Sequence, residues 1–376
     1  MSEPTNLAAK TLYAYKPRNV VGNPISGYKN FSHDFAGLDQ DLQYEVGKTF
    51  ENLSDVYFYG MNPLAIGYRF RLLDRDGLPC KFAEVTGFVR DEIEPQEYDR
   101  LCASKLIIDK EITLEELIRA HIEKSYQSII DKDREFLDSV FVSSSIKDDA
   151  WIYANNYNYT INASGNKTRI VSYCDNDLDS DSKNPLKASL IGFYSSIASI
   201  GDNVKLLSNG MANSLFVIGD YGTLTSNGLG SGIFAKGCGS DISSTGTSVE
   251  IISLGNEAKI SSTGNEAKIF IVGDAVCMTS TGDYTTVTVT GNKACVTNTG
   301  YDSRICYKGE RGVISLLGFG ATFNASEGTI VSAIDYDNNI SPIDLIKGRI
   351  GEDGLKPDTQ YVVEKGKFVE REVFNQ

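Results

Sequence analysis

Several features common in enzymes and membrane proteins are scarce or missing in this chain of 376 residues. The 7 cysteines are dispersed and include no C-x-x-C pair, so neither a metal site nor a redox motif is predicted. No apolar run approaches the roughly 18 residues that a membrane helix needs, so no membrane partner is expected. The N-terminus lacks a basic segment followed by an apolar core, so no secretory signal peptide is visible.

Catalytic signatures are missing as well. The chain has 2 histidines, His33 and His121, and 1 tryptophan, Trp151. It contains no G-x-S-x-G, H-E-x-x-H or P-loop motif. The sequence therefore predicts a protein that is not an enzyme and has no cofactor.

Glycine, by contrast, is abundant and strictly spaced. From Gly192 to Gly318 a glycine falls at every ninth residue without a miss. Counting the glycine as position zero, position five is always apolar, as in Ile233, and position three is mostly small. A nine-residue unit offers one short strand and one tight turn, and glycine supplies the positive φ that such turns need. Positions three, five and seven share one face of the strand, which we expect to point inward.

A second period of eighteen defines the coil. Alternate repeats end in Ser-Asn, Ser-Thr or Asn-Thr, while the others carry large apolar residues at position six. Two kinds of face in alternation predict two strands per coil. The expected fold is mainly β: a two-sided parallel β-solenoid with nonapeptide repeats and about 18 residues per coil.

The flanking segments lack the repeat. Strands are expected near residues 42–50 and 54–59, and Thr113 with Glu116 predicts a capping box that opens an amphipathic helix. The segment 360–370 predicts a β-hairpin with Lys365–Gly366 in its turn. The expected domains are an α+β N-terminal domain over 1–145, the solenoid over 146–328 and a C-terminal cap over 329–376.

The position-six residues form a candidate interface. Their side chains should point outward, and a row of large apolar residues is more than a monomer usually exposes. The row therefore lies either against another subunit or partner, or under the N-terminal helix or a loop. The candidate interface residues, with apolar neighbours at position eight, are Phe216, Phe234, Ile252, Phe270, Ile218, Leu254 and Val272.

Two polar patterns accompany the repeat. Asp or Asn often follows the glycine, as at Asp220 and Asn256, which allows either calcium binding or hydrogen bonds to the backbone of the turn. The missing G-G-x-G pattern favours the second reading. Position eight forms a polar ladder that either binds ice or carbohydrate or bonds to itself between coils: Asn209, Asn227, Thr245, Thr263, Thr281 and Thr299.

Both ends of the chain resemble a family of phage and prophage proteins. The motifs are LQYEVGKTFEN (42–52), FAEVTG (82–87), KLIIDKEITLEELIR (105–119) and GRIGEDGLKPDTQYVVEKGKFVE (348–370). Family members often carry a GFHAC-type stretch where this chain has VYFYGMNPLAIGY (56–68). The resemblance implies a small N-terminal domain followed by glycine-spaced repeats, without established catalytic residues. It also implies a location in the cytoplasm of a bacterial host or in a virion.

The leading functional hypothesis is a non-enzymatic binding or structural scaffold whose solenoid mediates self-association or partner docking. One alternative is an inhibitor that mimics nucleic acid, suggested by the net charge of −14. However, residues 192–318 hold ten acidic and eight basic residues, so the solenoid is nearly neutral, which argues against mimicry. No direct nucleic-acid partner is expected either. A second alternative is a virion module that binds a glycan receptor, and a third is a carbohydrate-active enzyme.

Overall fold

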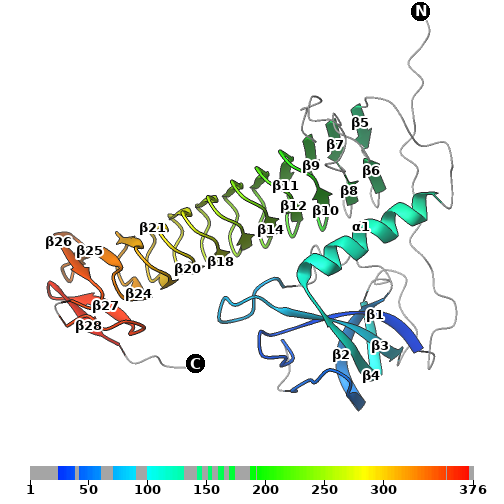
Figure 1. Cartoon of the computed structure of the whole chain (residues 1–376), viewed down its shortest axis with the longest axis horizontal. Coiled ribbons are helices and arrows are strands. Elements are labelled where there is room, and N and C mark those ends of the chain that lie inside the picture. The colour runs from blue at the N-terminus through cyan, green and yellow to red at the C-terminus, as the bar shows by residue number, and fades with distance from the viewer. Residues whose placement is uncertain are drawn as a thin grey trace, which may run out of the picture. The chain divides into compact units, whose positions relative to one another are not determined.

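The protein is mainly β and contains a two-sided parallel β-solenoid with about 18 residues per coil, preceded by a small α+β region (Figure 1). This confirms the predicted fold class. The computed structural model describes residues 24–38, 42–60, 71–89, 100–130, 142–145, 151–154, 160–164, 169–173, 187–191, 193–352 and 354–371.

The chain divides into two compact units. The first unit comprises Met1–Asp74, Pro79–Gly201 and Lys205–Phe216. The second unit comprises Arg75–Leu78, Asp202–Val204 and Val217–Gln376. A small barrel, the helix and the first coils thus belong to the first unit, and the later coils with the C-terminal strands belong to the second.

The barrel is closed by four antiparallel strands in the order β1-β2-β4-β3. Phe58 lies in its core, and a Cβ on Gly87 would lie 2.3 Å from the Phe58 ring, so glycine makes room for that side chain. The strand expected near residues 54–59 lies within β2, which shifts register between Glu51 and Val56. Of the strand expected near 42–50, only Thr49 and Phe50 belong to a strand, because Gln43 forms an isolated bridge and Val46–Gly47 form a turn. The strand bounds are β1 Pro24–Phe31, β2 Thr49–Gly60, β3 Lys81–Val89 and β4 Arg100–Ile112.

The helix α1 spans Leu114–Ile130 and begins at the predicted capping box. The Glu116 backbone N–H donates to Thr113 Oγ1 at 3.1 Å, and the Thr113 backbone N–H donates to Glu116 Oε2 at 2.7 Å. These two bonds satisfy N–H groups that a helix start otherwise leaves unpaired. Within the first unit α1 contacts β3 of the barrel and β8 and β10 of the first coils. In the described part of the chain, no helix is long and apolar enough to cross a membrane.

The coils build two parallel sheets, which we call sheet A and sheet B. Sheet A contains β6 Trp151–Ala154, β8 Arg169–Tyr173, β10 Ser196–Ile200, β12 Ser214–Ile218, β14 Gly232–Lys236, β16 Glu250–Leu254, β18 Lys268–Val272, β20 Thr286–Thr290, β22 Arg304–Lys308 and β24 Thr322–Ala325. Sheet B contains β5 Val142–Ser145, β7 Thr160–Ser164, β9 Lys187–Ile191, β11 Lys205–Asn209, β13 Thr223–Ser226, β15 Asp241–Ser244, β17 Lys259–Ser262, β19 Cys277–Ser280, β21 Cys295–Asn298, β23 Val313–Leu316 and β25 Ile330–Tyr336. The parallel strands therefore run from Val142 to Tyr336, compared with the expected range of 146–328.

The register follows the eighteen-residue period. Ile233 pairs with Ile251, and Ile251 pairs with Ile269. These position-five side chains are fully buried, as are the position-three and position-seven side chains such as Ala258 and Ser262. The interior of each coil is therefore lined by positions three, five and seven, as the alternation of a strand requires.

The repeated glycines serve close stacking as well as turn conformation. Five of them have the expected positive φ, between 142° and 151°: Gly201, Gly210, Gly219, Gly237 and Gly291. A Cβ on Gly264 would lie 1.8 Å from the carbonyl oxygen of Gly246, one coil earlier, and the same clash recurs along the solenoid. The left-handed residue of the turn is position two, which is usually not glycine, as in Glu266 with a φ of 58°. Any side chain at position zero would push neighbouring coils apart.

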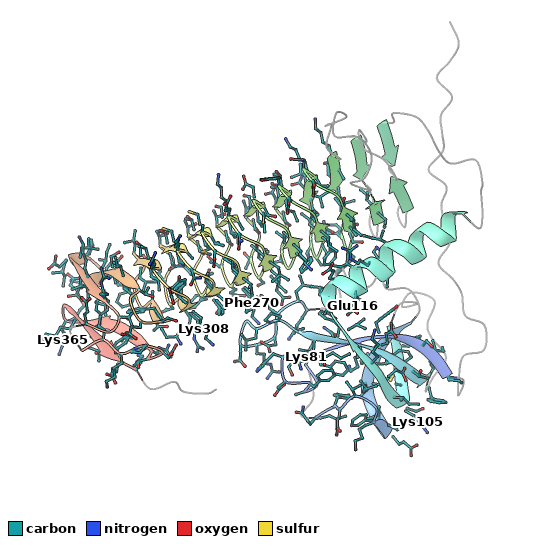
Figure 2. The ribbon with its side chains drawn as sticks, viewed as in Figure 1. Lys81, Lys105, Glu116, Phe270, Lys308 and Lys365 are labelled. Carbon is teal, nitrogen blue, oxygen red and sulfur yellow. The ribbon has the colours of Figure 1, made fainter. Side chains whose placement is uncertain are left out.

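Antiparallel strands end both sheets at the C-terminal side. β26 (Pro342–Arg349) pairs with β25 of sheet B, and β27 (Tyr361–Glu364) pairs with β24 of sheet A. β28 (Lys367–Glu370) completes the predicted hairpin. Lys365, labelled in Figure 2, and Gly366 form its turn with φ values of 50° and 72°.

Candidate functional site: the outer surfaces of the solenoid

The predicted apolar stripe follows consecutive strands of sheet A. The register pairs Phe234 with Ile252, and Ile252 with Phe270, which Figure 2 labels on β18. Phe234 is only 1% exposed although its neighbour at position five fills the interior. Phe216, Ile252 and Ile218 are also buried, Phe270 and Leu254 are half-buried, and Val272 is exposed. The chain itself therefore covers most of the stripe, which is the second of the two arrangements that the sequence left open.

A short loop segment lies against sheet A within the second unit. Arg75–Leu78 belongs to this unit, and a Cβ on Gly77 would lie 3.1 Å from Thr286 Cγ2 on β20. Gly77 has a φ of +76°, a conformation that side-chain-bearing residues rarely adopt. Thr288, which continues the position-six column beyond Phe270, is also buried. Close packing on this face therefore extends as far as β20.

The predicted polar ladder lies directly after the sheet B strands and is exposed along the second unit, from Asn227 to Thr299. One ladder bond joins consecutive coils, from Thr245 Oγ1 to Asn227 Oδ1 at 3.1 Å. Position six of the same strands adds a second file of small hydroxyl side chains, which the sequence interpretation did not recognise because both serine and threonine occur there. The second file consists of Thr225, Ser243, Ser261, Thr279 and Thr297.

Turn residues after the glycine bond to the next coil. Asp220 Oδ1 accepts the backbone N–H of Cys238 at 2.7 Å, and Asn256 Oδ1 accepts that of Asp274 at 2.9 Å. Asp274 in turn accepts the N–H of Asn292 at 2.7 Å. These oxygens therefore satisfy backbone donors, in agreement with the turn reading of the Asp and Asn residues.

The edge at which sheet B strands turn into sheet A strands carries exposed aromatic residues that the sequence interpretation missed. Tyr284 is 61% exposed, Tyr301 48% and Phe319 38%. These three come from consecutive coils, and the Phe319 ring packs edge-on against Tyr336 with a centroid distance of 5.8 Å. Burial raises the pKa of the Tyr336 phenol, with a smaller contribution from Tyr301. We call Tyr284, Tyr301, Phe319 and Tyr336 the aromatic strip.

The aromatic strip could have been found only by separating the two kinds of turn. Tyr284 stands at position two and Tyr301 at position one, so no single column of the nine-residue alignment holds both. In the sequence these positions look like variable turn residues. Stacking places them beside one another because turns of the same kind recur every two repeats.

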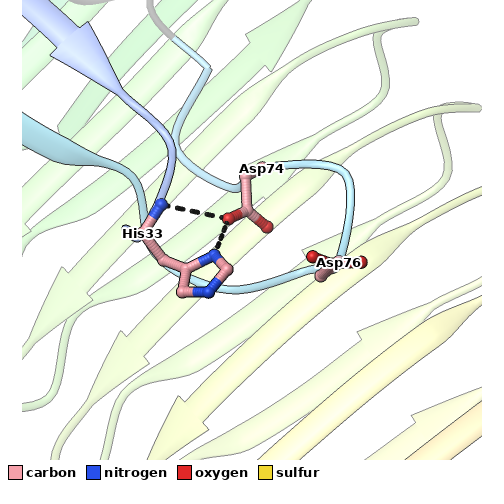
Figure 3. A group of neighbouring side chains, drawn as sticks. All are labelled: His33, Asp74 and Asp76. Atoms are coloured by element: carbon pink, nitrogen blue, oxygen red, sulfur yellow. Dashed lines mark hydrogen bonds and ion pairs between the residues drawn. The ribbon is translucent and has the colours of Figure 1, made fainter. Parts of the chain in front are cut away.

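A histidine and an acidic residue meet in the barrel region. His33 Nδ1 lies 2.5 Å from Asp74 Oδ2, and the His33 backbone N–H donates to the same oxygen at 3.1 Å (Figure 3). The possible ligand atoms of His33, Asp74 and Asp76 lie within 4.8 Å of one another. Asp74 is buried and holds the His33 turn through both bonds, so the pair has a structural role that needs no ion.

Comparison with protein-family models, curated proteins and solved structures finds no match to this chain. The fold therefore rests on the structure itself, and any function rests on its surfaces.

Proposed function

We propose that the protein is a non-enzymatic scaffold associated with a phage or prophage, and that its solenoid serves as a rigid support for docking. The aromatic strip is the observation that carries the docking part of this proposal. The phage association rests on the sequence resemblance of both chain ends. The proposed rigidity is supported by hydrogen bonds from backbone N–H groups to carbonyl and carboxamide oxygens of neighbouring coils, because these bonds fix each turn to the next.

The aromatic strip suits docking for two reasons. Tyrosine and phenylalanine offer large contact areas with few rotatable bonds, so ordering them on binding costs little entropy. Tyr284 and Tyr301 also sit on a backbone whose N–H groups are bonded: Tyr284 donates to Tyr301 O at 2.8 Å, and Tyr301 donates to Asp283 Oδ1 at 2.8 Å. The contact surface is therefore held in place before a partner arrives. A second copy of the chain or another protein is the occupant we favour.

A glycan receptor is the second candidate, and the same strip favours it. Exposed tyrosine rings have an apolar face and a hydroxyl, which suits both stacking on a sugar and hydrogen bonding to it. The sequence alone gave this reading little support because the solenoid carries phenylalanine more than tryptophan, which is the ring that sugar platforms often use. Nucleic-acid mimicry has weaker support, since acidic and basic residues nearly balance over residues 192–318.

The test compares solution mass by light scattering for the wild type, a double variant and a control. Tyr284→Ser with Tyr301→Thr removes two rings and introduces residues that the solenoid already carries in the same columns, at Ser248 and Thr247. Tyr221→Ser is the matched control, because Tyr221 occupies the same turn position on the opposite edge and is 59% exposed.

Each outcome favours one candidate. A wild-type oligomer that becomes a folded monomer only in the double variant supports docking through the strip. If the wild type is a monomer, a glycan array with the same three proteins follows, and binding lost only in the double variant supports the receptor role. If the double variant behaves like the control in both assays, the strip mediates neither self-association nor glycan binding.

A further inference from the structure

Two cysteines stand side by side on the exposed face of sheet B. Cys277 on β19 and Cys295 on β21 are register partners in a parallel pair, and both are exposed. Each opens its strand at position four, on the face that points away from the interior. The two thiols therefore project from the same side of adjacent coils.

The spacing of the strands brings this pair within range of a disulfide. Neighbouring strands lie about 4.8 Å apart, and Cα atoms joined by a disulfide are usually about 4.4–6.8 Å apart. The Cβ atoms of a disulfide are closer, at about 3.8 Å, so the two strands must approach slightly when the bond forms. Backbone bonds oppose that shift, since Cys277 N donates to Ala258 O at 2.9 Å and Cys295 N donates to Val276 O at 2.8 Å. A bridge here would be mildly strained.

The surroundings of the two thiols differ. Lys259 is the register partner of Cys277 on the preceding strand. Val313 is the partner of Cys295 on the following strand and offers no charge. Partial burial, and to a smaller degree the charge of Cys277, raise the pKa of Cys295. Cys277 is thus the thiol suited to attack first, and Cys295 the thiol suited to resolve.

We propose that Cys277 and Cys295 form a reversible disulfide with a low-molecular-weight disulfide, such as oxidised glutathione, as the oxidant. The Cys277 thiolate attacks one sulfur of the oxidant, forms a mixed disulfide and releases one glutathione thiolate. Cys295 loses its proton and attacks the Cys277 sulfur, which forms the protein disulfide and releases the second glutathione. The protein loses two electrons and two protons, and the oxidant is reduced to two thiols.

Because of this strain, we expect the disulfide to be reversible and not a permanent structural cross-link. Strained and exposed disulfides have higher reduction potentials than structural ones, so a modest excess of thiol reopens them. Closing the bond ties two consecutive coils together on the face that carries the polar ladder. The inference is independent of the docking role proposed for the aromatic strip, which lies on the edge of the solenoid.

The test uses the full chain with oxidised glutathione and peptide mapping by mass spectrometry. Trypsin cleaves after Lys293, so Cys277 falls in peptide 269–293 and Cys295 in peptide 294–304. We expect these peptides to become cross-linked with the loss of two hydrogen atoms and to separate again with dithiothreitol. Cys295→Ser should instead retain one glutathione on Cys277, whereas Cys238→Ser, which changes another exposed cysteine, should still form the cross-link.

Two results would overturn the proposal. In the first, both peptides carry glutathione and remain separate, which means that the thiols cannot reach each other. In the second, both stay reduced while Cys238 is modified, which means that the pair does not react although the oxidant is active. Far-UV circular dichroism of each variant checks that the solenoid is folded.

Discussion

Replacing Gly264 by alanine tests whether close stacking is what requires glycine at every ninth residue. The new Cβ would lie 1.8 Å from Gly246 O and 2.3 Å from the carbonyl carbon, whereas ordinary contacts lie at 3.4–4 Å. Relief requires the two coils to move apart near this point. The nearby bonds from Thr263 N to Ser244 O at 2.9 Å and from Ser248 N to Asn265 O at 2.8 Å would then break.

The expected loss of stability is large for a single methyl group. Two lost hydrogen bonds account for about 2 kcal/mol, and the crowding itself adds about 1–3 kcal/mol. We therefore expect Gly264→Ala to lower the free energy of unfolding by about 3–5 kcal/mol. Urea denaturation followed by circular dichroism measures this free energy. The dependence of the free energy on urea concentration is compared between variants to check that the unfolded state is unchanged.

Gly230→Ser is the matched control. Gly230 has a φ of +63° and nothing within 4 Å of a built Cβ. The next coil already carries Ser248 in the same column with a φ of 55°. We expect a loss of only about 1 kcal/mol from the left-handed conformation. Equal shifts of the urea midpoint for the two variants would refute steric stacking as the reason for the glycines.

Three further predictions concern buried side chains. Phe234→Ala should cost about 3–5 kcal/mol, measured by urea denaturation, while the exposed Val272→Ala should cost much less. Ser262→Ala should leave the free energy of unfolding unchanged or raise it by about 1 kcal/mol, because Ser262 Oγ is buried without a hydrogen-bond partner in the described structure. Ser208→Ala, by contrast, should destabilise the protein, because Ser208 Oγ accepts a hydrogen bond from Asn213 Nδ2 at 2.8 Å. Burial raises the pKa of Tyr44 from 10.0 to about 12, so its stabilising contribution is complete below pH 10 and is lost as the pH approaches 12. Alkaline titration of the wild type and Tyr44→Phe should show this difference, and identical alkaline transitions would contradict it.

The parts of the fold that the sequence predicts well depend on local or strictly periodic information. The capping box at Thr113 and Glu116 involves residues three apart, and the hairpin at Lys365–Gly366 needs only its own turn. The solenoid was predictable because identical positions meet every two repeats, so a one-dimensional period specifies the register. In each case the interacting residues can be read from one spacing.

The parts that the sequence does not predict depend on neighbours that no spacing reveals. The stripe at Phe234 and Ile252 reads as an outward row, and only the folded chain shows that these side chains are covered. The sequence also did not reveal that close stacking requires the glycines, because the carbonyl that meets Gly264 belongs to another coil.

Both edges of the solenoid have a glycine at position zero of each turn, but they differ in whether coil stacking accounts for the aromatic residues that follow this glycine. On one edge, Asp220 and Asp274 accept N–H groups of the next coil, and Tyr221 lies where a Cβ on Gly239 would meet its ring at 2.6 Å. Stacking thus accounts for these residues. On the other edge, Asn265 and Asp283 accept N–H groups of the next coil in the same way. Among the described residues, however, stacking does not require the exposed rings of Tyr284 and Tyr301, since Ser248 and Thr247 fill the same columns at another coil. Residues that stacking does not require, and that leave apolar surface in water, are the ones for which a partner is the simplest physical reason.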